Sequence, residues 1–151
     1  MKKLFFVVAF ALSSILCFGQ DINGRVIFKP VVSDTLAVTD QVRKILADKM
    51  TLMCTQNGVE AGESRYVITP DVMVLEKRMT SSIPPKCVVE LEVSVQVVDT
   101  LVREKISETE ITLTSIESNE AKAIHKAISR MNVRSSQIRK FITVTRKKLE
   151  Q

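Results

Sequence analysis

Aromatic residues are scarce in this chain of 151 residues: they make up 5% of it, with no Trp and a single Tyr, Tyr66. Sites that bind sugars or stack on bases rely on aromatic platforms, so this composition argues against both. No glycine-rich phosphate loop is present either, which leaves nucleotide binding without support. The core must therefore be built mainly from Val, Ile, Leu and Met.

Metal ligands are equally few. His125 is the only histidine, and Cys17, Cys54 and Cys87 are the only cysteines. They do not have the spacing of a zinc site, and no local signature of a Ser or Cys nucleophile is present. We therefore expect no metal and no cofactor, and we interpret His125 as an ordinary helix residue.

The first 20 residues have the layout of a secretory signal peptide. Lys2 and Lys3 precede an apolar run of about 15 residues, which is short for a membrane span of about 20. We expect cleavage near Gly19 or Gln20, which leaves residues 21–151 as a single domain. The protein would then work in the periplasm or outside a Gram-negative cell.

A rival interpretation makes Cys17 the lipid-bearing cysteine of a bacterial lipoprotein. Leu16 stands directly before it, where the lipidation signal requires Gly, Ala or Ser. We therefore favour a cleaved signal peptide over a lipid anchor.

Loss of Lys2 and Lys3 with the signal lowers Lys plus Arg from 22 to 20 against 17 acidic residues, so the net charge falls from +5 to +3. So small a charge does not indicate nucleic acid as a partner. An exported chain meets oxidising conditions, and Cys54 and Cys87 could form one disulfide. Two separately buried thiols fit better, because neither cysteine lies in a disulfide-dense pattern.

Residues 86–100 carry the clearest pattern in the chain, an alternation of apolar and polar positions that is unbroken from Val89 to Val97. This period of two predicts a strand with one buried and one wet face. Its apolar positions are Cys87, Val89, Leu91, Val93, Val95 and Val97.

Three further strands are expected. The first covers residues 26–28, and Pro30 marks an edge position or the end of the strand. The second covers residues 65–77, in which Pro70 should mark a bulge or an edge. The third covers residues 103–116, with Ile111 and Leu113 inward, and completes an antiparallel meander with the strand at 86–100.

Helical spacing marks the rest of the chain. One helix starts from an N-cap at Thr39, has a methionine-bearing apolar stripe and stops at Asn57 and Gly58. A second starts from an N-cap at Ser118 and ends at Asn132, and a third begins at Ser135 or Ser136. The apolar face expected for the second helix is Ala121, Ile124, Ile128 and Met131, and that of the third is Ile138, Phe141, Ile142, Thr145 and Leu149.

These elements together predict a two-layer α/β (α+β) fold. One mixed or antiparallel sheet of about four strands should pack on about three helices that cover one of its faces.

Two groups of charged residues are candidates for function. Glu90 and Glu92 project to the same wet face and could act as an acid and base pair, although such residues more often keep a sheet soluble. The segment 122–148 contains nine basic residues and no acidic one. We take Arg139, Lys140, Arg146 and Lys147 as a candidate anion-binding surface, unless the basic residues pair with the acidic strands of the same molecule.

Three segments carry a resemblance to known proteins: 65–86, with its Ile-Pro-Pro loop at 83–85, then 88–99, and 118–142, with its Ser-Asn-Glu-Ala-Lys start. They resemble a family of small, uncharacterised exported proteins of Bacteroidetes. In broader outline they are similar to the periplasmic α/β domain of the curli secretion channel and of penicillin-binding protein activator lipoproteins. The resemblance implies a binding or assembly module without enzymatic activity.

We therefore expect a non-enzymatic module that binds another envelope protein or an anionic envelope component. Membrane contact would be peripheral at most, and a homo-oligomer is compatible with this role. The alternatives are a hydrolase of an envelope polymer that uses Glu90, Glu92 or His125, and an anion-binding protein that uses the basic C-terminal helices.

Overall fold

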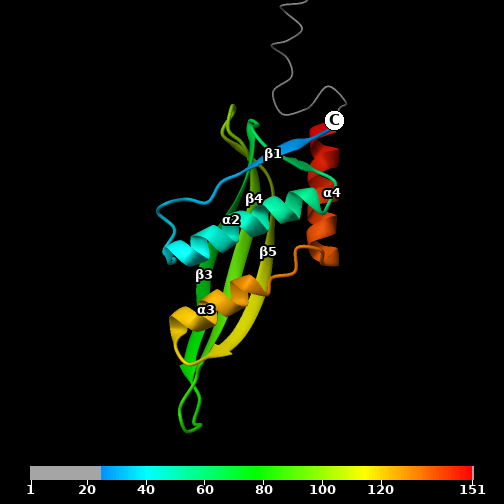
Figure 1. Cartoon of the computed structure of the whole chain (residues 1–151). Coiled ribbons are helices and arrows are strands. Elements are labelled where there is room, and N and C mark those ends of the chain that lie inside the picture. Colours follow the sequence, from blue (N-terminus) through cyan, green and yellow to red (C-terminus); the bar gives the residue numbers. More distant parts are fainter. Residues whose placement is uncertain (1–24, 151) are drawn as a thin grey trace, which may run out of the picture.

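The computed structural model describes residues 25–150, so the predicted signal peptide and the lipidation of Cys17 lie outside the described residues. Five strands form one mixed sheet in the order β2-β1-β3-β4-β5, with three helices packed on it (Figure 1). The elements in chain order are β1 (Ile27–Pro30), α2 (Asp40–Thr55), β2 (Glu60–Ala61), β3 (Tyr66–Met79), β4 (Cys87–Asp99), β5 (Glu104–Glu117), α3 (Glu120–Ser129) and α4 (Ser136–Glu150).

The two-layer α+β fold predicted from the sequence is confirmed, with one more strand than expected. The additional strand, β2, is only two residues long and pairs in parallel with β1 at Ile27↔Glu60 and Phe28↔Ala61. A segment this short carries no periodic pattern, which is why the sequence did not predict it. Pro30 ends β1, as expected.

The strand predicted at 86–100 is β4, the central strand of the antiparallel meander β3-β4-β5. The six apolar positions of its alternation, from Cys87 to Val97, are 0–2% exposed. They form the floor of the core under the helices, which cover this face only (Figure 1). The other face of the three long strands, which we call the open face, is covered by no helix of residues 25–150.

The ends of α2 agree with the prediction. The Thr39 hydroxyl accepts a hydrogen bond from the Val42 N–H at 3.2 Å, as an N-cap does. Beyond the last turn, Gly58 has a φ of +82°, the left-handed conformation in which glycine is favoured. The methionine stripe is core, because Met50 and Met53 are fully buried.

The limits and the buried face predicted for α3 were partly wrong. Asn119 rather than Ser118 is the N-cap, and the helix ends at Ser129 rather than at Asn132. Ala123 and Ala127 are buried with Ile128 and Met131, whereas Ala121 is exposed. Helix α3 contacts β4 and β5, and its two small buried alanines allow a close approach.

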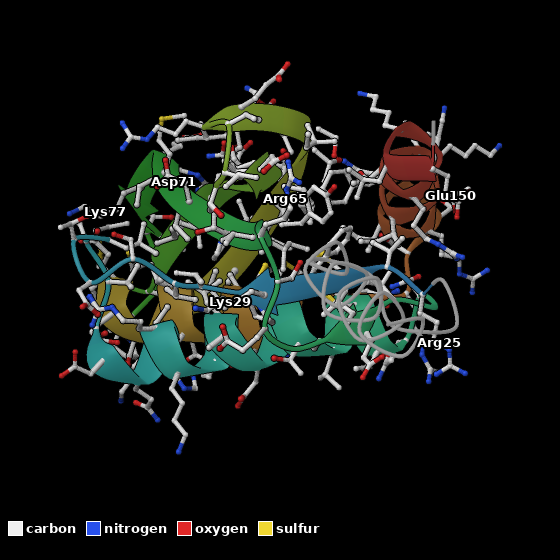
Figure 2. The ribbon with its side chains drawn as sticks, turned by 90° about the horizontal axis from the view of Figure 1, so that it is seen from above. Arg25, Lys29, Arg65, Asp71, Lys77 and Glu150 are labelled. Atoms are coloured by element: carbon white, nitrogen blue, oxygen red, sulfur yellow. The ribbon has the colours of Figure 1, made fainter. Side chains whose placement is uncertain are left out.

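The third helix, α4, is as predicted. The Ser135 hydroxyl accepts from the Ile138 N–H at 3.3 Å at its start. The expected apolar face is buried, with Leu149 partly so. The helix packs against β5 at one edge of the sheet. Asp71 and Lys77 of β3 lie on the far side of the molecule from this helix (Figure 2).

Pro70 marks an edge and not a bulge. It pairs in register with Val95, and the irregularity of β3 falls later, between Val74 and Glu76. The Ile68 carbonyl accepts from the Val31 N–H at 3.0 Å, so the main chain of Ile68 points toward β1. Two residues on, the main chain of Pro70 points to the same side, where β1 has ended. The missing N–H of the proline therefore falls where no neighbouring strand needs it.

Candidate functional site: the free edge of β3

Most of β3 has a neighbouring strand on one side only. Strand β1 pairs with it at Lys29↔Val67 and Pro30↔Ile68, and β4 pairs with it along its whole length. Within residues 25–150, no strand pairs with the outer side of residues 70–79, which we call the free edge of β3. At its start, Pro70 is buried and lines a pocket together with the loop before α2. Unpaired N–H and C=O groups along such an edge can accept another strand.

The free edge also carries exposed apolar side chains. Met73, Val74, Leu75 and Met79 are 53%, 41%, 45% and 57% exposed. The irregularity after Val74 makes Leu75 an extra residue in the strand, so apolar side chains emerge on both faces around it. A chain that docks here would bury apolar surface in addition to forming backbone hydrogen bonds.

The opposite edge of the sheet, β5, is protected. Side chains of α3 and α4 donate to its backbone carbonyls: Lys126 Nζ to Ile116 at 3.3 Å and Lys148 Nζ to Ile106 at 3.1 Å. The amide of Gln137 donates to the carbonyl of Glu110. Basic and amide side chains thus occupy acceptors that a foreign strand would need. On the free edge of β3, the Val72 N–H donates to the carboxylate of the neighbouring Asp71 at 2.9 Å, which is a local contact within the strand.

The sequence contains a feature that indicates this exposed apolar edge, although the strand prediction for residues 65–77 did not take it into account. Residues 72–75 are four consecutive apolar residues, Val-Met-Val-Leu, which interrupt the alternation expected of a strand with one covered face. A strand that is half-covered cannot bury side chains of both parities, so some of them must be exposed.

Glu90 and Glu92 lie on the open face, as predicted. They are half-buried by their neighbours and form no ion pair within residues 25–150. His125 is on α3, which packs on the opposite face of β4 and β5. The sheet therefore separates His125 from the two glutamates, and the three do not meet at one site.

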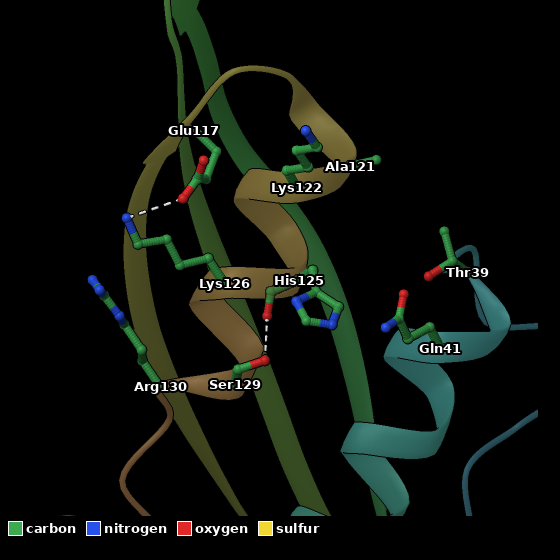
Figure 3. Close-up of a pocket in the computed structure, with 9 residues that line it drawn as sticks. All are labelled: Thr39, Gln41, Glu117, Ala121, Lys122, His125, Lys126, Ser129 and Arg130. Carbon is green, nitrogen blue, oxygen red and sulfur yellow. Dashed lines mark hydrogen bonds and ion pairs between the residues drawn. The ribbon is translucent and has the colours of Figure 1, made fainter.

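His125 instead lines a groove of about 610 Å³ between α2 and α3 (Figure 3). Its ring points toward Thr39 and Gln41, while Lys126 turns away to pair with Glu117 at 3.2 Å. No carboxylate within residues 25–150 forms an ion pair with the imidazole, and no group of three or more His, Cys, Asp or Glu residues there could hold a metal ion.

The candidate anion-binding residues gather on α4. Arg139, Lys140 and Lys147 are exposed, and Arg146 is half-buried beside Gly58. None of the four forms an ion pair with a residue of the described part of the chain. Among the nine basic residues of 122–148, only Lys126 pairs with an acidic strand residue there, Glu117.

The remaining candidate groups are the two cysteines. Cys54 and Cys87 are both buried free thiols, the arrangement favoured over a disulfide. Burial raises the pKa of the Cys54 thiol to about 12. A thiol with so high a pKa is almost entirely protonated at neutral pH and is a poor nucleophile.

No protein-family model and no curated protein sequence matches the chain. The resemblance to exported Bacteroidetes proteins and to the curli channel domain stays a prediction. Among solved structures, the chain is similar to a minor lipoprotein from Acinetobacter baumannii, with 17% identity, a TM-score of 0.47, and coverage of 80% of this chain and 94% of that one. It is also similar to a Xanthomonas campestris protein of the DUF330 family (12% identity, TM-score 0.48, coverage 83% and 86%). A third similar structure is a lipoprotein from Neisseria meningitidis, with 8% identity, a TM-score of 0.41, and coverage of 66% of this chain and 89% of that one.

Proposed function

We propose that the protein is a non-enzymatic binding module of the cell envelope, which takes up an extended segment of another envelope protein along the free edge of β3. The observation that carries this proposal is the unpaired edge of residues 70–79 with exposed Met73, Val74, Leu75 and Met79. Backbone hydrogen bonds would supply affinity, and the apolar side chains would select the partner.

The contrast between the two edges of the sheet supports a binding role for β3. Exposed edges are a liability in natural proteins, and this chain protects β5 with side chains from two helices. The four exposed apolar side chains of this long edge do not stabilise the folded chain by burial. Exposed apolar surfaces of this kind are typical of sites that bind a partner protein.

Export is part of the same proposal. The basic start and short apolar run of the first 20 residues support it. Within residues 25–150, no helix is long and apolar enough to cross a membrane. Mass spectrometry of the protein from cells should find an N-terminus near Gln20 or Asp21, and an acylated Cys17 would contradict a cleaved signal without a lipid.

Site-specific photo-crosslinking in cells tests the binding site. A photoreactive residue at Leu75 or Met79 should crosslink the same envelope protein. The control is Leu101, which is 71% exposed in the turn between β4 and β5 and outside the free edge. Equal crosslinking from Leu101, or crosslinks from Leu75 and Met79 only to a second copy of this chain, would contradict the proposal.

A pair of charge variants tests the same surface without a probe. Leu75→Lys with Met79→Lys should abolish the crosslinked complex, because lysine is a residue that natural edges use to prevent strand pairing. Leu101→Lys with Val102→Lys adds the same charge at an apolar site that is more exposed, and it should leave the complex intact.

A further inference from the structure

We propose that the protein self-associates by docking α4 of one copy on the open face of the sheet of another copy. This goes beyond strand addition at β3, because it uses other surfaces and a different partner. None of the described helices covers the open face, and the charges on it are opposite to those on α4.

The open face carries a cluster of carboxylates in three successive cross-strand rows. The registers place Asp71, Ser94 and Glu110 in one row, Met73, Glu92 and Thr112 in the next, and Glu76, Glu90 and Thr114 in the third. Residues directly opposite each other in antiparallel strands project to the same face. We call Asp71, Glu76, Glu90, Glu92 and Glu110 the acidic sheet face.

Few ion pairs within the described part of the chain compensate the charge of these carboxylates. Among residues 25–150, Glu76 forms an ion pair with Arg78 at 3.9 Å, and the other four carboxylates form none. Glu76 and Glu90 stand directly opposite each other, an arrangement that destabilises a sheet through repulsion of like charges. A cationic surface laid over this face would relieve that repulsion.

Helix α4 has a matching surface. Arg139, Lys140 and Lys147 fall within about 100° of arc on the helix, since each residue advances by about 100°. They are exposed and form no ion pair within the described chain. We call them the cationic face of α4.

The two faces also agree in size. Arg139 and Lys147 are about 12 Å apart along the helix axis, at about 1.5 Å per residue. The three carboxylate rows, from Glu90 to Ser94 on β4, extend about 14 Å at about 3.4 Å per residue. The width of three strands, about 10 Å, is close to the diameter of a helix.

The two faces cannot meet within one molecule. Helix α4 is fixed beside β5 by its buried side, including Ile138, Phe141 and Ile142, and by the contact of Thr145 with Ser107 at 2.5 Å. Its cationic face points away from this buried side. A second copy therefore supplies the complementary surface, and each chain brings both halves of the interface.

Sedimentation of the purified protein at two salt concentrations is the first test. At about 0.01 M salt, where screening extends over about 30 Å, the wild type should sediment as an oligomer. At about 1 M salt, where the screening length is about 3 Å, it should dissociate. A wild type that stays monomeric at low salt overturns the proposal, as does an oligomer that is indifferent to salt.

Two charge-reversal variants then locate the interface. The sheet variant Glu90→Lys with Glu92→Lys and the helix variant Arg139→Glu with Lys140→Glu should each weaken self-association by at least about tenfold. An equimolar mixture should associate again, because the intact helix of the first variant meets the intact sheet of the second. Mixing that restores nothing would overturn the proposed pairing of faces, even if each variant alone is monomeric.

Matched variants control for net charge. Asp34→Lys with Asp48→Lys changes the charge as the sheet variant does, and Lys44→Glu with Lys86→Glu changes it as the helix variant does. All four residues are exposed and lie outside both faces. These controls should associate like the wild type, and a loss of association in them as large as in the test variants would overturn the proposal. Circular dichroism should show that every variant keeps the wild-type secondary structure.

Discussion

Arg65 and Asp99 join the start of β3 to the end of β4 through two hydrogen bonds, from Nε to Oδ1 at 3.0 Å and from Nη2 to Oδ2 at 2.6 Å. The Leu101 N–H donates a third bond to Oδ1 at 3.0 Å. Asp99 is only 5% exposed. The bonds from Arg65 hold the pKa of the Asp99 carboxyl below its ordinary value, against the opposing effect of burial.

Asp99→Asn should lower the free energy of unfolding by about 1–3 kcal/mol at neutral pH, because the substitution removes the charge from these bonds and keeps the size of the side chain. A carboxyl with a lowered folded pKa contributes stability above its unfolded pKa of about 3.9 and loses that contribution as the pH falls through the folded value. Urea unfolding should therefore show the difference at pH 7 and little of it at about pH 2. The matched control is Asp71→Asn, on the exposed edge, and an equal difference at both pH values would contradict the explanation.

Gly58→Ala should destabilise the protein by about 1–2 kcal/mol, because an L-residue is strained at a φ of +82°. The new Cβ would also lie 3.3 Å from Nη1 of Arg146. Gly62→Ala is the control, since its Cβ would be at an ordinary 3.6 Å from Ile27 and its φ is not in the left-handed region. Thermal unfolding should separate the two variants, and equal melting temperatures would argue against strain at Gly58.

Removal of two buried hydroxyls, those of Ser115 and Thr145, should change the free energy of unfolding in opposite directions. Ser115 is 6% exposed and its Oγ finds no hydrogen-bond partner among residues 25–150, so Ser115→Ala should raise the free energy of unfolding by about 1 kcal/mol. Thr145 is fully buried, and its hydroxyl donates to the Phe141 carbonyl at 2.7 Å. Thr145→Val should lower stability by about 1–2 kcal/mol. Chemical denaturation of both variants checks this, and a change of the same sign in both would refute it.

The two buried thiols should react slowly with a thiol reagent in the folded protein. After unfolding, both should react fully even when no reductant is added. Cys54 combines complete burial with a pKa raised to about 12, so it presents little thiolate. Titration with a thiol reagent should find both Cys54 and Cys87 in the unfolded chain. If neither reacted until a reductant was added, the two would be joined in a disulfide.

The helices and strands predicted best were those in which the local sequence pattern matches the burial that tertiary packing imposes. The alternation of β4 matches the structure because one face of this strand is wholly buried. The caps at Thr39 and Ser135 could be predicted because their hydrogen bonds join residues only three positions apart. The face of α3 was misjudged, because Ala121 and Ala123 are equally apolar and only contact with β4 and β5 decides which is buried. Helical spacing alone cannot make that choice.

The candidate surfaces were less predictable, since they depend on strand register and strand order. Asp71 and Glu110 are remote in the sequence and share a row only through their pairing with Ser94. The free edge of β3 exists because β1 ends at Pro30, whereas β3 continues to Met79. No local pattern states how long a neighbouring strand will be.

Pro70 also limits how a visiting strand can align. Opposite this residue, a carbonyl of the visitor would find no N–H to accept, and the next outward N–H, that of Val72, is already bonded to Asp71. The full exchange of hydrogen bonds is open only beyond them, toward Met79. A partner segment would therefore be short and would have one favoured register, so its sequence should be recognisable by a few apolar residues at fixed positions.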